Sequence, residues 1–420
     1  MNVTIPAGRP VYIWGASWLG IAFLKYLTSR LGHKVEAFID NDANLAGQKV
    51  AGLPVLTSGN FFENIPSGAF VVLASIQYAK DMAAELTAHG LLEGLDFIAA
   101  GRLRPHSYCL EVAGVCNLRC PSCACGNSPR RAGDCLMKLG DCEKALDKIV
   151  REDPLAHNIS LYNWGEPFLH PELPRIIEMC NDRGFETLLS SNLNIDRNLE
   201  EVVKASPAWF KVSLSGYGPS YERTHAGGRW ETLLANLKKL AALREKHSPE
   251  MQVDVGYHVY THNCLEERDQ MRELVRSLGF TFRETLAFIF PLDILAAYVS
   301  GAPLPPKAEE VSKMLLLPLS EGLKMVQAEA DVPCGDMDKI IVAWDMTVQP
   351  CCTWFAPGAY AADWKYESFL SAPAAHFKKA RTESGLCRSC MKMGLHHWLD
   401  LYARKDLLEE RLKLFREARV

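Results

Sequence analysis

The sequence contains no apolar run long enough to cross a bilayer and no strong excess of charge of either sign. A transmembrane helix needs about 20 consecutive apolar residues, and no segment of the 420 residues approaches that length. The first residues also lack the basic start and apolar stretch of a signal peptide. The formal net charge is −4, so we expect neither nucleic acid nor a membrane as a partner. These features predict a cytoplasmic globular protein, long enough for two or three domains.

Cysteine, by contrast, is abundant and unevenly placed. The chain has 14 cysteines, and in a reducing compartment clustered cysteines indicate metal or redox chemistry, because disulfides are disfavoured there. One group lies near residue 120 and a second lies between residues 334 and 390. The others are scattered, and we expect them to be ordinary core or surface residues: Cys109, Cys135, Cys142, Cys180 and Cys264.

The first group follows a short strand-like run, Tyr108 to Val112, with Cys116, Cys120 and Cys123 in a C-x3-C-x2-C pattern. A strand, a loop and then a helical region place these sulfurs at the carboxyl end of a strand in a β/α repeat, where such folds keep their chemistry. Three cysteines on one [4Fe-4S] cluster leave one iron without a protein ligand, and a small molecule can chelate that iron. A zinc site that adds Cys125, or buried cysteines without a metal, are the alternatives.

From Tyr108 to about Phe290, strand-like runs alternate with amphipathic helical patterns, which predicts a parallel α/β barrel that is not fully closed. The predicted strands are 108–112, 159–163, 186–190, 209–214, 253–260 and 280–284. Polar residues follow several of them, namely Glu166, Asn192, Ser213, Ser215 and Asn263. All would share one rim with the cysteine loop, where they supply hydrogen-bonding groups for a bound cofactor.

The cysteine loop and the segment N-W-G-E-P, residues 163–167, together resemble the radical S-adenosylmethionine (SAM) enzymes. The resemblance implies a partial (β/α)6 TIM-like barrel over residues 105–320, with a [4Fe-4S] cluster on the three cysteines and SAM on its open iron. It also implies that Glu166 receives the methionine amino group, and that Asn192 and Ser213 stand at polar cofactor-binding positions of the third and fourth strands. Ser122 stands where family members often have an aromatic residue.

Family members commonly carry an arginine about ten residues after the fourth-strand serine, where it binds the SAM carboxylate. By spacing from Ser213 that residue is Arg223, whereas alignment through the following Ala-Gly-Gly places His225 there. We favour Arg223.

The last hundred residues offer a second set of thiols around a predicted hairpin, residues 339–349. They are Cys334, Cys351, Cys352, Cys387 and Cys390, enough to close a metal site fully. This segment, residues 321–420, resembles the SPASM/twitch-type auxiliary-cluster domain in its short form. The resemblance implies a second [4Fe-4S] cluster held by Cys334, Cys351, Cys387 and Cys390, with Cys352 a free neighbour. A zinc ribbon is the alternative.

Residues 1–104 form a separate α/β unit by pattern: strand 11–15, a glycine turn 15–20 that opens a helix, and strand 35–40 ending in Asp40. This is the Rossmann order, with Asp40 placed to meet a ribose hydroxyl, although G-x4-G is a weak signal for a nicotinamide cofactor. The unit is similar to small Rossmann-like domains of sugar-modifying enzymes. A nucleotide-linked ligand and a docking role without a ligand are equal alternatives. Residues 102–106 are the predicted linker to the barrel.

The resemblance implies an oxidoreductase-type enzyme that cleaves SAM reductively to a 5′-deoxyadenosyl radical and abstracts hydrogen from a substrate. We expect a small molecule, such as a sugar or nucleotide-linked compound, and a net oxidation or rearrangement. Modification of a ribosomal peptide or protein is the alternative within enzymes. A non-catalytic, zinc-stabilised scaffold is the alternative of another class. A flavodoxin or ferredoxin is the implied electron donor.

Overall fold

The computed structural model of the chain describes residues 5, 8–75, 78–99, 106–125, 135–153 and 156–418. Two compact units are present: Met1–His106 with Ile149–His157, and Ser107–Lys148 with Asn158–Val420. The predicted linker, residues 102–106, lies outside the described residues except for His106. The division into three domains at residues 104 and 320 stays a prediction.

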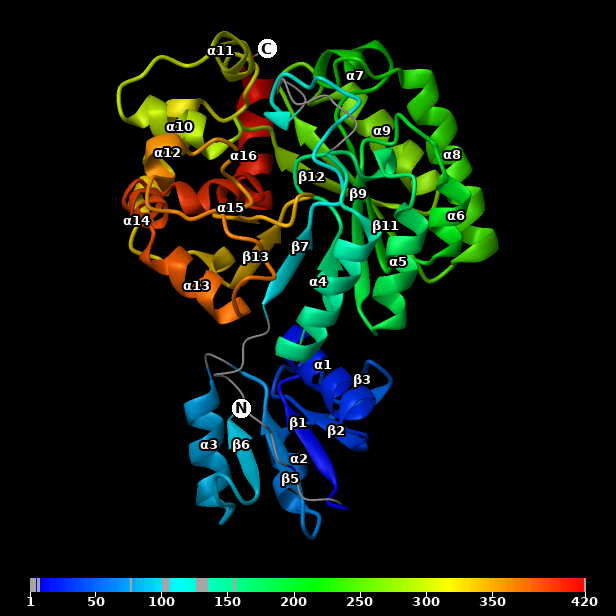
Figure 1. Cartoon of the computed structure of the whole chain (residues 1–420), viewed down its shortest axis with the longest axis vertical. Coiled ribbons are helices and arrows are strands. Elements are labelled where there is room, and N and C mark those ends of the chain that lie inside the picture. The colour runs from blue at the N-terminus through cyan, green and yellow to red at the C-terminus, as the bar shows by residue number, and fades with distance from the viewer. Residues whose placement is uncertain are drawn as a thin grey trace. The chain divides into compact units, whose positions relative to one another are not determined.

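The first unit is built on a six-stranded sheet in the order β3-β4-β2-β1-β5-β6, drawn in blue in Figure 1. All neighbours are parallel except β3, which pairs antiparallel with β4. The strands are β1 (Val11–Trp14), β2 (Val35–Ile39), β3 (Lys49–Val50), β4 (Leu53–Leu56), β5 (Phe70–Leu73) and β6 (Phe97–Ala99). The helices are α1 (Trp18–Lys25), which continues as a π-helical turn over Tyr26–Arg30, α2 (Ser58–Glu63) and α3 (Ala79–Ala88).

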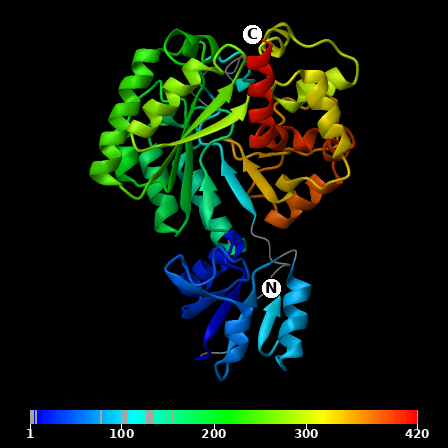
Figure 2. The ribbon, with the colours of Figure 1, turned by 180° about the vertical axis from the view of Figure 1, so that it is seen from behind.

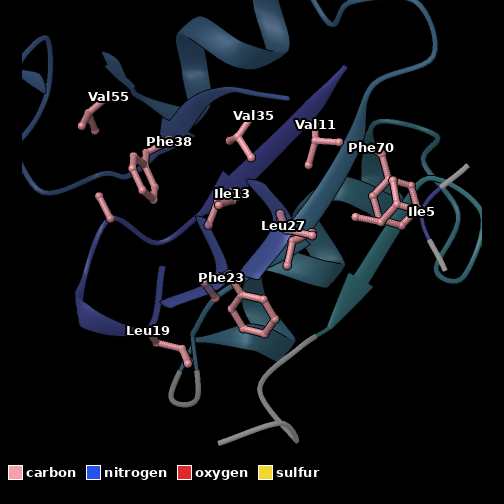
Figure 3. Close-up of a cluster of buried hydrophobic side chains, with 13 residues drawn as sticks. Ile5, Val11, Ile13, Leu19, Phe23, Leu27, Val35, Phe38, Val55 and Phe70 are labelled. Atoms are coloured by element: carbon pink, nitrogen blue, oxygen red, sulfur yellow. The ribbon is translucent and has the colours of Figure 1, made fainter. Parts of the chain in front are cut away.

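This sheet has a hydrophobic core on each face because successive strand residues point to opposite sides. Val11 and Ile13 of β1 join a buried cluster with Phe23 of α1, which Figure 3 shows. Tyr12 and Trp14 of the same strand join a second cluster, to which α2 and α3 contribute. Burial on both faces explains why the strands of this sheet are almost continuously apolar.

The second unit contains an eight-stranded sheet in the order β12-β11-β10-β9-β8-β7-β13-β14. From β7 to β12 each strand lies parallel to the next along the chain. The strands are β7 (Ser107–Leu110), β8 (Asn158–Ser160), β9 (Glu186–Ser191), β10 (Trp209–Leu214), β11 (Gln252–Val259), β12 (Thr281–Leu286), β13 (Lys339–Val342) and β14 (Val348–Gln349). The prediction of an α/β fold with parallel sheets is confirmed, while the full (β/α)6 repeat and a separate auxiliary domain stay predictions.

Helices connect these strands, and Figures 1 and 2 show α5, α6 and α8 along the outer side of the sheet. Leu173, Ile176, Ile177 and Cys180 of α5 are buried at the spacing of one helix face. The connecting helices are α4 (Leu139–Glu152), α5 (Leu173–Asp182), α6 (Leu199–Lys204), α7 (Pro219–Thr224), α8 (Trp230–His247) and α9 (Glu266–Ser277). Among the described helices, none combines the length and the apolar character that a bilayer span requires.

The C-terminal part adds its hairpin directly to this sheet. Strand β13 pairs parallel with β7, with Lys339 opposite Ser107, and β14 pairs antiparallel with β13. The hairpin itself was predicted, but its attachment to the first strand of the unit was not. The helices beyond β12 are α10 (Leu292–Val299), α11 (Pro306–Ser312), α12 (Leu319–Ala328), α13 (Ala374–Glu383), α14 (Gly385–Lys392), α15 (Trp398–Tyr402) and α16 (Lys405–Glu417).

Candidate functional site

The cysteine loop begins just beyond β7 and holds three partly exposed thiols, Cys116, Cys120 and Cys123. The Cys123 amide donates to the Cys120 carbonyl at 3.0 Å, which closes a tight turn between them. The Leu118 amide donates to Cys116 Sγ at 3.4 Å. Burial, the charge of Glu166 and the charge of Cys123 raise the pKa of Cys116 to about 12. The three thiols therefore lie close enough to oppose one another's ionisation, which a bound cation would reverse.

The N-W-G-E-P segment packs against the strand end that leads into this loop. The Glu166 amide donates to the Val115 carbonyl at 2.8 Å. A methyl group at Gly165 would lie 1.8 Å from the Ala113 carbonyl oxygen, a distance that no side chain tolerates. Glycine at position 165 is therefore required for the backbone after β8 to approach the start of the cysteine loop.

The Glu166 carboxylate is only 2% exposed and joins the ends of two strands. It accepts hydrogen bonds from Ser191 Oγ and the Asn192 amide, both at 2.8 Å, and from the Phe168 amide at 3.2 Å. Burial raises its pKa to about 7, although these hydrogen bonds act in the opposite direction. Two carboxylate oxygens offer about four acceptor positions, and three are used here. Its predicted bond to the SAM amino group stays a prediction.

Asn192, at the end of β9, reaches directly into the cysteine loop. Its Nδ2 donates to Asn117 Oδ1 at 2.9 Å and lies 3.7 Å from Cys116 Sγ. Its Oδ1 accepts from the Asn194 amide at 2.9 Å, which fixes the orientation of the amide group. The structure thus brings Glu166, Asn192 and the cysteine loop together. The sequence analysis did not single out Asn117.

Ser213 lies on β10, where its Oγ shares a hydrogen bond with Ser190 Oγ of β9 at 3.2 Å. Arg223 is exposed on α7, and its charge acts with burial to lower the pKa of His262 to about 4. Both ring nitrogens of His262 are buried, and neither has a hydrogen-bond partner in the described part of the chain. Within that part, no hydrogen bond or ion pair joins Arg223 to Ser213 or Glu166.

His225, the alternative to Arg223, is stacked on Tyr221 with ring centroids 4.7 Å apart. Its Nδ1 shares a hydrogen bond with Thr224 Oγ1 at 3.0 Å. Burial lowers its pKa to about 4, so the ring is neutral near pH 7 and carries no charge for a carboxylate. The contact between Arg223 and the SAM carboxylate stays a prediction.

Strands β9 to β11 carry polar side chains on one face of the sheet, which we call the polar inner face. Its charged residue, Lys211, was not predicted. Lys211 of β10 stands beside Ser190 and Asp254 in the sheet register. Its side chain lies over Gly256, because a methyl group there would be 2.8 Å from Lys211 Cε. Gly256 is two residues nearer the carboxyl end of β11 than Asp254, so Lys211 leans toward the end at which the cysteine loop lies. Burial lowers the pKa of Lys211 despite the charge of Asp254.

The second cysteine group surrounds one cavity of about 100 Å³ in the C-terminal part. Cys334, Cys351, Cys387 and Cys390 all line it. Cys352 is absent from this lining, and its Sγ lies instead 3.7 Å from Asp336 Oδ2 and 3.8 Å from Lys339 Nζ. The structure therefore gathers the four cysteines that were predicted as ligands, while their role as ligands stays a prediction.

The choice between a four-iron cluster and a single zinc ion at the two thiol groups stays a prediction. Across the described residues, no three Cys, His, Asp or Glu side chains are grouped so that they could hold a metal ion. Zinc draws its thiolates to about 2.3 Å from one point, whereas a [4Fe-4S] cluster separates its thiolates because each binds a different iron. The Cys125 thiol, the fourth ligand of the zinc alternative, is buried and lies 3.7 Å from the Gly114 carbonyl oxygen.

In the first unit, the glycine turn is held by Asp40. Its Oδ2 accepts from the Ala16 amide at 2.8 Å, and its Oδ1 accepts from the Asp42 amide at 3.0 Å. A methyl group at Gly20 would lie 1.9 Å from the Gly15 carbonyl oxygen, so glycine permits the close packing of α1 on β1. Asp40 thus has a structural role, and its predicted contact with a ribose stays a prediction.

Comparison with known proteins finds a similarity over the central segment. Residues 110–273 match the model of the Radical SAM superfamily, and no curated protein matches the sequence. Three similar solved structures are BtrN in complex with AdoMet and 2-DOIA, SuiB of Streptococcus suis bound to S-adenosylmethionine, and anSMEcpe with bound AdoMet. Their sequence identities to this chain are 14%, 14% and 13%, and their TM-scores are 0.41, 0.45 and 0.46.

The matches cover 72%, 75% and 75% of this chain and 92%, 76% and 98% of the respective relatives. Residues 110–273 are thus similar to the Radical SAM superfamily, and the cofactors of that family are a [4Fe-4S] cluster and SAM.

Proposed function

We propose that this chain is a radical SAM enzyme that abstracts hydrogen from a small polar molecule, such as a sugar or a nucleotide-linked compound. One observation carries the proposal: Asn192, at the end of β9, donates to Asn117 within the cysteine loop. That contact brings a polar strand end to the thiols that would hold the cluster. It lies inside the segment that matches the family.

A bound cluster would supply the electron for reductive cleavage of SAM, and the resulting 5′-deoxyadenosyl radical would be the group that takes a hydrogen atom from the substrate. Cys116, Cys120 and Cys123 would hold three irons of this cluster and leave the fourth open for SAM. Glu166 fixes the end of β9 through Ser191 and Asn192. Arg223 is the cation available for the SAM carboxylate. Burial of the Glu166 carboxylate keeps water away from that end of β9.

The polar inner face is the observation that favours a small hydrophilic substrate in this proposal. Ser190 and Ser213 present hydroxyls to each other, and Lys211 adds a positive charge on the same face of β10. His258 of β11 lies near Lys211. Burial and the charge of Lys211 lower the pKa of His258 to about 3. A lysine beside hydroxyls and a neutral imidazole suits a substrate that carries hydroxyl groups and an anionic group. A nucleotide-linked sugar has both.

Two further parts of the proposal concern the flanking regions. The parallel strands of the first unit, numbered along the chain, lie in the order 3-2-1-4-5, which is the Rossmann order and supports a nucleotide-holding domain. The four cysteines around one cavity support an auxiliary [4Fe-4S] cluster. Cys334, Cys351, Cys387 and Cys390 would hold this cluster, which would supply an acceptor for the electron that a substrate radical loses in a net oxidation, with the proton going to solvent.

The test is reductive SAM cleavage by the anaerobically reconstituted full chain, with a flavodoxin or dithionite as electron donor. We expect 5′-deoxyadenosine from the unsubstituted protein and none after C116A/C120A/C123A. The matched control is C125A, which removes the nearest other thiol of the same loop and keeps cleavage under this proposal. A triple variant that still cleaves SAM would overturn the proposal. A C125A variant that loses its metal would favour the zinc alternative.

The substrate class is tested separately by thermal stabilisation with nucleotide sugars and with peptides, in the presence of SAM. A ligand that binds only the folded state stabilises the protein by mass action. At a ligand concentration of 100 times Kd, the free energy of unfolding rises by about 2.7 kcal/mol. Stabilisation by a nucleotide sugar supports the small-molecule substrate. Stabilisation by peptides alone would contradict it and favour modification of a ribosomal peptide.

A further inference from the structure

Arg381 of α13 is a buried cation in the cavity that the four C-terminal cysteines line. The residue is 3% exposed. Its Nη2 donates to Cys351 Sγ at 3.4 Å. Its Nη1 donates to two backbone carbonyls, of Asp336 at 2.8 Å and of Lys339 at 2.6 Å. These bonds hold the guanidinium in one orientation against a predicted ligand sulfur.

Two backbone carbonyls and the Cys351 sulfur accept hydrogen bonds from this buried charge. No ion pair within 4 Å joins Arg381 to a carboxylate in the described residues, and its Nε is buried there without a hydrogen-bond partner. Cys334, Cys351 and Cys387 line the same cavity as Arg381. An isolated buried guanidinium is strongly unfavourable unless opposite charge lies close by. Ionised thiolates around the cavity would supply that charge.

We propose that Arg381 raises the reduction potential of a [4Fe-4S] cluster held by Cys334, Cys351, Cys387 and Cys390. This inference rests on the auxiliary cluster of the proposed function. An added electron makes a four-thiolate cluster one unit more negative, so a fixed positive charge beside it stabilises the reduced form more than the oxidised form. Hydrogen bonds to cluster sulfurs and nearby charge are known determinants of such potentials.

Arg388 provides the matched comparison within the same segment. It lies between Cys387 and Cys390 in sequence, but its side chain is 62% exposed and faces Asp363 at 3.8 Å. Water and the carboxylate screen its charge. Removing the charge of Arg388 therefore changes the net charge near the cluster as much as removing that of Arg381, without altering the buried contact with sulfur.

The experiment uses the full chain carrying C116A/C120A/C123A, so that only the auxiliary cluster contributes. R381Q, R381K and R388Q are introduced singly, iron per chain is measured, and the midpoint potential is followed by electron paramagnetic resonance (EPR). We expect R381Q to retain iron and to disfavour reduction by at least tenfold, which is about 59 mV for one electron. We expect the midpoint potential of R381K, which keeps the charge, to shift less than that of R381Q. The midpoint potential of R388Q should equal that of the parent protein.

The outcomes separate this inference from the auxiliary cluster itself. If the triple variant holds iron but R381Q has the parent potential, or shifts no more than R388Q, the role of Arg381 is overturned and the cluster stands. If the triple variant holds no iron, both are overturned. If R381Q does not hold iron, the potential of R381K alone tests the role of Arg381. A tenfold decrease in the equilibrium constant for reduction in R381K, which retains the charge, would contradict a charge-based role.

Discussion

Gly165 lies directly against Ala113, so that a methyl group at position 165 would stand 1.8 Å from the Ala113 carbonyl oxygen. This contact joins the N-W-G-E-P segment to the strand end that opens the cysteine loop. We predict that G165A displaces the loop, at a cost of about 1–3 kcal/mol in stability, and lowers both iron content and SAM cleavage.

Iron analysis and thermal unfolding check this prediction, with G140A as the control. Gly140 lies in α4, and a methyl group there would meet no atom within 4 Å. G140A should therefore leave iron content unchanged. A G165A protein with full iron content would show that the close approach of the two backbones does not position the loop.

Glu166 makes stability depend on pH in a direction set by its raised pKa. Burial moves its pKa from 4.5 to about 7 in the folded state, so the folded state binds the proton more tightly than the unfolded chain. The resulting stabilisation is complete below pH 4.5 and is lost as the pH rises through 7. It amounts to about 3 kcal/mol.

Comparison of E166Q with the parent tests this. The unfolding free energy of the parent should fall between pH 5 and pH 8 relative to that of E166Q, in which position 166 does not titrate. Denaturant unfolding at several pH values in that window measures the difference. Parallel pH profiles for the two proteins would contradict the raised pKa.

Lys211 should act on the substrate and not on SAM. Its side chain leans over Gly256 on the inner face of the sheet, so K211M is expected to keep SAM cleavage and to lose the thermal stabilisation given by an anionic nucleotide sugar. The matched control is K238M, which removes an exposed lysine of α8. A K211M protein stabilised as fully as K238M would remove Lys211 from the substrate site.

Cys351 and Cys352 are adjacent in sequence but differ in environment. Cys351 lines the C-terminal cavity, whereas Cys352 contacts Asp336 and Lys339. We predict that C351A removes the iron of the auxiliary cluster and that C352A retains it. Iron per chain, measured in the C116A/C120A/C123A protein, distinguishes the two; equal losses from both variants would contradict the assignment of Cys351 alone.

Short-range patterns in the sequence were sufficient to predict individual strands. The alternation of VDVGYHVY predicted a strand at 253–260, and β11 spans Gln252–Val259. The alternation of WFKVSL predicted a strand at 209–214, and β10 spans Trp209–Leu214. Both rest on a short-range hydrophobic period, which is visible in the sequence itself.

Contacts between distant segments could not be predicted in the same way. The pairing of β13 with β7 joins segments far apart in the chain, and the sequence of neither strand indicates which strand it pairs with. The bond between Asn192 and Asn117 is of the same kind. Lys211 did leave a local signal, since it is a charged residue in the middle of the strand W-F-K-V-S-L, but its position over Gly256 depends on the register between two strands.

The most direct test of the central claim, that Cys116, Cys120 and Cys123 hold a cluster with an open iron for SAM, is EPR of the reduced protein with and without SAM. We expect SAM to change the signal of one cluster, because SAM binds that cluster's iron, and we expect this signal to be missing from C116A/C120A/C123A. A signal that SAM leaves unchanged, or one that survives in the triple variant and still responds to SAM, would contradict the account.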